Sequence, residues 1–156
     1  MKDNTGGKDK SDEKRPKREY DLAERTARFA ESIVDFANRM PRTPVTIPLI
    51  TQLVKAGTSV GANDREADES VSVREFRNKV GYCKKEASET KYWLRVIARA
   101  VPKMKDEARG LWQEANELHL IFSASFRTAS RRMEAEQAPI RAGRRTRQSS
   151  VDMEEA

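Results

Sequence analysis

Several kinds of residue are scarce in this sequence, and each shortage excludes a class of protein. Cys83 is the only cysteine, so no internal disulfide can form and a reducing compartment is expected. No apolar run approaches the roughly 20 residues that a membrane-spanning helix needs. The residues up to Arg18 are charged and lack the apolar stretch of a secretory signal, so we expect a cytoplasmic protein.

Side chains that usually carry catalysis or hold metals are equally scarce. His119 is the only histidine, and the residue three before it is Asn116, so the Glu-x-x-His pairs of bundle di-metal sites are missing. No Walker loop, G-x-G-x-x-G motif or Ser-His-Asp set occurs. Cys83 with Lys84 beside it does not make a nucleophile. We therefore expect no enzyme activity, no metal and no cofactor.

The composition that remains is typical of a charged helical protein. Lys and Arg number 31 against 25 Asp and Glu in 156 residues, and the net charge of +6 favours polyanionic partners. Glycine and strand-favouring residues are few, which favours helix. Residues 1–18 and 134–156 hold too few apolar side chains to form a core. We expect both segments to be disordered tails around a single domain at 19–133.

Capping residues and prolines predict the ends of four helices. An Asp or Ser at the N-cap accepts a hydrogen bond from a free backbone N–H of the first turn, and proline ends a helix. The predicted helices begin near Asp21, Thr46, Ser72 and Met104, and Pro41, Pro44 and Pro102 separate them.

Apolar side chains recur within each segment at alternating spacings of four and three residues. This period is typical of helices that cross at shallow, left-handed angles. In the third helix the stripe is Phe76, Val80, Cys83, Ala87, Thr90, Leu94, Ile97 and Val101. In the second it is Leu49, Leu53, Ala56, Val60, Asn63 and Ala67. Four such helices with short connectors predict an all-α, antiparallel up-down four-helix bundle.

Two glycines interrupt the second helix at a cost of roughly 1 kcal/mol each relative to alanine. Gly57 and Gly61 lie one turn apart among other small residues. They indicate either a close approach of two helices or a groove for a ligand or partner. Asn63 lies on the predicted apolar stripe, where an amide can select helix register or oligomeric state.

Cations gather on one flank of the third helix. Arg77, Lys84 and Lys91 are spaced seven residues apart, and Lys91, Arg95 and Arg99 are spaced four residues apart. Like charges four residues apart repel each other along a helix. Carboxylates on neighbouring helices or subunits would relieve the repulsion, and so would nucleic-acid phosphate. Tyr82, Tyr92 and Trp93 lie nearby and would either stack on bases or pack inside the protein. The candidate partner-binding residues are Arg77, Lys84, Lys85, Lys91, Arg95 and Arg99, with Arg141, Arg144, Arg145 and Arg147 in the C-terminal tail.

Two motifs in the second and third helices resemble a known family. Ser59, Val60, Gly61, Ala62, Asn63 and Glu66 resemble its S-V-G-A-N-x-x-E-A signature. Lys85, Glu86, Glu89, Tyr92, Trp93 and Leu94 resemble its K-E-A-x-E-(S/T)-x-Y-W-L signature. The family is that of the bacterial four-helix-bundle proteins, also called 23S ribosomal RNA intervening-sequence proteins. Asp64 departs from the family pattern, which carries an apolar or aromatic residue there.

The resemblance implies a homopentamer of up-down bundles with no enzymatic activity. It also implies relatedness to the accessory variability determinant of diversity-generating retroelements, a basic pentamer that associates with a reverse transcriptase and nucleic acid. We therefore expect an oligomeric scaffold associated with RNA or DNA. The alternative is an adaptor that binds a reverse transcriptase or another acidic protein without affinity for free nucleic acid.

Overall fold

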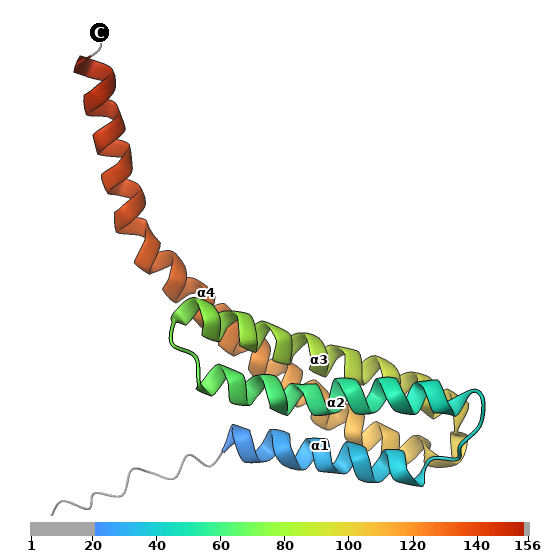
Figure 1. Cartoon of the computed structure of the whole chain (residues 1–156). Coiled ribbons are helices and arrows are strands. Elements are labelled where there is room, and N and C mark those ends of the chain that lie inside the picture. The colour runs from blue at the N-terminus through green and yellow to red at the C-terminus, as the bar shows by residue number, and fades with distance from the viewer. Residues whose placement is uncertain (1–20, 155–156) are drawn as a thin grey trace, which may run out of the picture.

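The protein forms an up-down bundle of four α-helices (Figure 1). The structure is a computed structural model that describes the backbone of residues 21–154 and the side chains of residues 21–140. The helices are α1 at Leu22–Arg39, α2 at Thr46–Asp68, α3 at Val73–Ala100 and α4 at Lys105–Glu154, with a 3-10 turn at Pro102–Met104. Within residues 21–154 there is no strand, so the predicted fold class is confirmed.

Side-chain caps begin two of the helices where the sequence predicts them. Asp21 Oδ1 accepts from the backbone N–H of Glu24 at 3.2 Å and starts α1. Ser72 Oγ accepts from the N–H of Glu75 at 3.1 Å and starts α3. Glu75 Oε2 in turn accepts from the N–H of Val71 at 3.1 Å, so its carboxylate satisfies a further free donor.

The predicted stripe of α3 and the buried residues of α4 form most of the core. Every stripe residue of α3 from Val80 to Val101 is buried, and Phe76 is partly buried at one end. The largest side chains that are fully buried are Phe36, Phe122, Ile33, Leu53, Leu94, Ile97 and Leu118, drawn from all four helices. A core shared in this way holds the helices at fixed rotations, which decides which residues face outward.

The predicted stripe of α2 is wrong at one position. Asn63 is only partly buried, and its Nδ2 donates to the carbonyl of Ser59 in its own helix at 2.9 Å. Asp64 is the buried residue instead, with 5% of its surface exposed. The reason is that α1 approaches α2 closely at Gly57 and Gly61, so the buried face of α2 includes Gly57 and is wider than a heptad stripe.

The two glycines of α2 allow a close approach to α1. A Cβ at Gly57 would lie 2.8 Å from Ile33 Cγ1, and a Cβ at Gly61 would lie 3.3 Å from the backbone oxygen of Thr26. The S-V-G-A-N motif therefore belongs to the α1–α2 contact. Of the two interpretations of the glycines, the close helix approach is the one that the structure supports.

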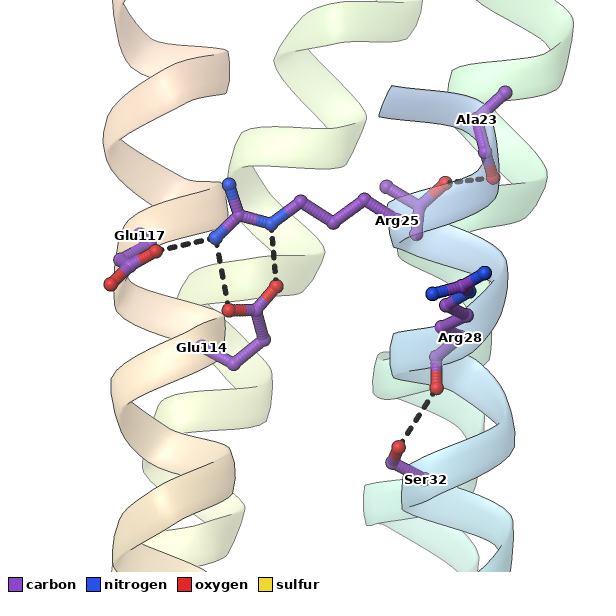
Figure 2. Close-up of polar contacts among 7 residues, drawn as sticks. Ala23, Arg25, Arg28, Ser32, Glu114 and Glu117 are labelled. Atoms are coloured by element: carbon purple, nitrogen blue, oxygen red, sulfur yellow. Dashed lines mark hydrogen bonds and ion pairs between the residues drawn. The ribbon is translucent and has the colours of Figure 1, made fainter. Parts of the chain in front are cut away.

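Charged contacts tie α1 to α4, the two helices at the ends of the chain order. Arg25 Nε and Nη2 donate to Glu114 Oε1 and Oε2 at 2.7 and 2.9 Å (Figure 2). Arg25 Nη2 also donates to Glu117 at 2.5 Å. Arg39 pairs with Glu107 at the other end of α1. These carboxylates are therefore committed to α1 and lie away from the cations of α3.

From residue 134 we expected a disordered tail, and the described backbone is helical there instead. The backbone of α4 stays helical to Glu154 and leaves the bundle as a projecting rod (Figure 1). Good helix formers such as Ala135 and Gln137 continue the pattern, and extending a helix that already exists needs no new nucleus. The expected N-terminal tail at 1–18 lies outside the described residues.

Candidate nucleic-acid interface

The cations predicted on α3 line the side of that helix that packs beside α4. Arg77 Nε donates to Ser130 Oγ at 2.7 Å, and its guanidinium carbon lies 4.5 Å from the ring centroid of Phe126. The ammonium of Lys84 lies 5.5 Å from the centroid of the same ring. Stacking on an aromatic face keeps both cations ordered without neutralising them.

Lys91 occupies the middle of this side and contacts three residues of α4. Its Nζ donates to Asn116 Oδ1 at 3.0 Å and lies 3.4 Å from His119 Nδ1. The same ammonium is 5.5 Å from the ring centroid of Trp112. Burial, and then the charges of Lys91 and Lys84, lower the pKa of His119. His119 is therefore neutral at pH 7, and the ammonium of Lys91 carries the local charge.

These cations have no carboxylate partner in the part of the chain whose side chains are described. We name the basic strip by its members, which are Arg77, Lys84, Lys91, Arg95 and Arg99. None of them forms an ion pair there, although Arg25, Arg28, Arg39, Lys79 and Arg132 do. The expectation that carboxylates on neighbouring helices relieve the strip is wrong for the carboxylates of residues 21–140. A subunit, another protein or a phosphate backbone remains as the source of negative charge.

A groove of about 730 Å³ lies where the C-terminal end of α3 meets the start of α4, and we call it the junction groove. Its apolar lining, which we call the floor, consists of Leu94, Ala98, Pro102 and Ala108. Its other lining residues are Arg95, Arg99, Lys105, Arg109, Trp112 and Gln113. Four cations and no carboxylate line it, whereas a carboxylate lines each of three other hollows on the described surface, which contain Asp68, Glu114 and Glu89.

A second hollow of about 570 Å³ continues along the same two helices. Lys84 and Lys85 line it together with Tyr92, His119 and Phe126. Lys85 therefore lies beside Lys84 in a hollow that Glu89 also lines. Tyr92 is 58% exposed there, whereas Trp93 packs partly against the core and donates through Nε1 to Glu89 at 3.2 Å. Of the two neighbouring aromatic residues, Tyr92 is the one available to a partner.

Sequence reasoning missed the α4 half of this surface. Trp112, His119 and Phe126 are spaced seven residues apart, the same interval that separates Arg77, Lys84 and Lys91 on α3. Two stripes with one period lie side by side when their helices pack antiparallel. The signal was present in the sequence, but the register that pairs the two stripes was not.

The remaining predicted residues fall into two groups. Arg141, Arg144, Arg145 and Arg147 belong to the projecting part of α4, and their side chains lie outside the described residues. The motif residues mostly support the bundle. Val60 and Leu94 are buried, Ser59 donates to the carbonyl of Lys55 at 2.6 Å, and Glu66 pairs with Lys79 between α2 and α3. Glu86 is partly buried, which together with Glu89 raises the pKa of its carboxyl.

Nothing in the described residues indicates a catalytic centre. Burial and the charge of Asp64 raise the pKa of the Cys83 thiol to about 12, and its Sγ lies 3.6 Å from the carbonyl oxygen of Val60. A buried thiol in that state is a weak nucleophile. No group of three or more His, Cys, Asp or Glu side chains among residues 21–140 is arranged to hold a metal. None of the helices in that part of the chain has the length and apolar character to cross a bilayer.

Comparison with known proteins gives a family match and a structural match. The family model described as 23S rRNA-intervening sequence protein matches residues 18–124. A crystal structure from Bacteroides thetaiotaomicron, described as a protein with unknown function from the S23 ribosomal protein family, is 26% identical with a TM-score of 0.63. The match covers 68% of this chain and 95% of that one. No curated protein matches the sequence.

Proposed function

This chain belongs to the family of 23S rRNA-intervening sequence proteins, and we propose that it is a non-enzymatic bundle that binds RNA or DNA through the α3–α4 surface. The observation that carries the proposal is the basic strip, whose five cations lack carboxylate partners among the described side chains. Three of them, Arg77, Lys84 and Lys91, lie over the rings of Phe126 or Trp112. Phosphate is the ligand that neutralises such an arrangement without a matching protein surface.

The dimensions of the strip suit a polymer better than a small ion. Arg77 and Arg99 are separated by about 33 Å along α3, at 1.5 Å of rise per residue. Charges spaced over that length meet several successive phosphates of one strand. Assembly of several copies, as the family resemblance implies, supports the same function, because a pentamer would multiply the +6 of one chain fivefold.

Charge reversal of the strip tests the proposal. Arg95→Glu combined with Arg99→Glu is expected to weaken RNA and DNA binding roughly tenfold or more at low salt, because both exposed cations become repulsive. The slope of log K against log salt should flatten by roughly 1.5. Fluorescence anisotropy over a salt series measures both quantities.

The matched control is Arg42→Glu combined with Lys55→Glu, which changes the net charge equally at exposed positions on another part of the surface. Equal losses in both double variants would mean that only the overall charge matters. A wild-type chain that binds neither RNA nor DNA at low salt would leave the rival function, an adaptor for a reverse transcriptase or another acidic protein. A pull-down with and without nuclease then identifies that partner.

Binding should tighten as the pH falls, through His119. Burial, and then the charges of Lys91 and Lys84, keep the pKa of His119 low in the free protein, and a bound phosphate nearby would raise it again. Binding then takes up a proton, so affinity rises as the pH falls between the bound and free pKa values and levels off below both. His119→Gln should remove this increment, as measured by anisotropy between about pH 7.5 and 5. An unchanged pH profile in that variant would place the strand away from His119.

A further inference from the structure

The junction groove combines an aromatic ring with cations in a way that the rest of the strip does not. Trp112 is 38% exposed and lines the groove beside Arg99 and Arg109. Within the described residues these two arginines have no carboxylate partner. Exposing an indole ring to water is unfavourable, because the ring is among the largest apolar side-chain groups, so its exposure indicates a binding partner.

Building on the proposed function, we propose that the junction groove binds an unpaired base of single-stranded nucleic acid, stacked on Trp112, with the flanking phosphates held by Arg95, Arg99 and Arg109. The guanidinium group offers a planar fork of donors that matches phosphate oxygens. The indole and the apolar floor offer a flat contact to the base. A volume of about 730 Å³ is within the range of sites that hold small planar ligands.

The shape of the site favours a single strand over a duplex. In a duplex the faces of the bases are covered by their neighbours, so a ring lining a groove between two helices reaches only backbone and edges. A flexible strand can turn one base into the groove while its neighbours continue along the strip. The second hollow, with Tyr92 and His119, lies on that path, and Trp112 and Phe126 are about 21 Å apart along α4.

The same features favour nucleic acid over an acidic peptide. Carboxylates would neutralise Arg95, Arg99, Lys105 and Arg109 equally well, but an acidic side chain leaves the indole and the apolar floor uncovered. Every nucleotide combines the π face of its base with a phosphate in one repeating unit. The arrangement of ring, floor and cations therefore fits a nucleotide unit more completely than a row of charges.

The test compares ligands that differ in whether their bases are present and unpaired. The full chain and its Trp112→Leu variant are titrated with a labelled single strand, a strand of equal length with abasic sites, and the matching duplex. We expect the wild type to prefer the strand with bases, and Trp112→Leu to weaken that binding roughly fivefold to a hundredfold. Binding of the abasic strand and the duplex should hardly change. Tyr82→Leu is the matched control, since Tyr82 is 51% exposed on another side of α3.

A fluorescence measurement keeps the proposal testable if Trp112→Leu fails to fold. The chain has two tryptophans, so in a Trp93→Phe background only Trp112 emits. Stacking of a base should quench that emission on addition of the single strand, and the abasic strand should leave it unchanged. Equal quenching by both strands would overturn the stacking proposal.

Each negative result would overturn a different one of the two proposed binding sites, or both. If Trp112→Leu binds the single strand as tightly as wild type while Arg99→Gln weakens every ligand, the stacking site is wrong and the basic strip stands. If polyglutamate of equal charge competes as well as the single strand, the groove is a site for acidic protein. If no nucleic acid binds at low salt, both proposals are overturned.

Discussion

Gly57→Val should lower the free energy of unfolding by about 3 kcal/mol, a large fraction of the stability of a small bundle. A Cβ at Gly57 would lie 2.8 Å from Cγ1 and 2.9 Å from Cγ2 of Ile33, closer than these atoms can approach. Ile33 is fully buried within the core, so it can move only by displacing other buried side chains. The branched side chain must therefore push α1 away from α2 and open the core.

Gly110→Val is the control for this prediction, because a Cβ at Gly110 would have nothing within 4 Å. Valine and glycine differ by only a few tenths of a kcal/mol in helix propensity, so this variant should be about as stable as wild type. Urea unfolding followed by circular dichroism gives both values. Similar losses at the two sites would contradict the close approach of α1 and α2.

Asp64→Leu should do the opposite and stabilise the protein by about 2 kcal/mol at neutral pH. Asp64 is 5% exposed, and among the described residues its side chain accepts one hydrogen bond, from Thr26 Oγ1 at 3.3 Å. Burial, and then the charge of Asp68, raise the pKa of its carboxyl. Leucine removes the buried charge, and Thr26 keeps its other hydrogen bond, to the carbonyl of Ala23 at 3.1 Å.

The stabilisation by Asp64→Leu should depend on pH in a direction that the pKa shift determines. The folded protein holds the proton of Asp64 more tightly than the unfolded chain, so the wild type loses stability when this carboxyl ionises. The advantage of leucine is therefore full above the raised pKa and shrinks as the pH falls toward about 4. Asp35→Leu, at an exposed carboxylate of α1, should change stability by less than about 0.5 kcal/mol. An advantage that does not vary with pH would contradict the buried charge.

Local signals in the sequence were sufficient for the helices of the bundle. The carboxylate of Asp21, the hydroxyl of Ser72 and the ring of Pro102 act on the residues next to them, so the predicted helix ends agree with the structure. The stripe of α3 follows from the same period, because its buried residues from Val80 to Val101 recur at alternating spacings of three and four residues.

The prediction for α2 failed where a side chain depends on two neighbouring helices. A strict heptad placed Asn63 inward, but contacts with both α1 and α3 bury Gly57 and Asp64. The stripe of one helix does not show how many partners the helix has. The burial of Asp64 is therefore a property of the packing, even though its departure from the family pattern was visible.

For the candidate site too, the sequence determined some features and the tertiary structure determined others. The sequence by itself determined four amphipathic helices, a row of cations on α3 and the absence of a recognisable catalytic set, because these depend on residue type and on spacing within one helix. Only the tertiary structure decided that Lys91 lies over Trp112, that Arg25 takes the carboxylate of Glu114, and that a groove forms between α3 and α4. Those contacts join residues far apart in the chain, so they depend on the register and rotation of packed helices, which the burial of the shared core sets.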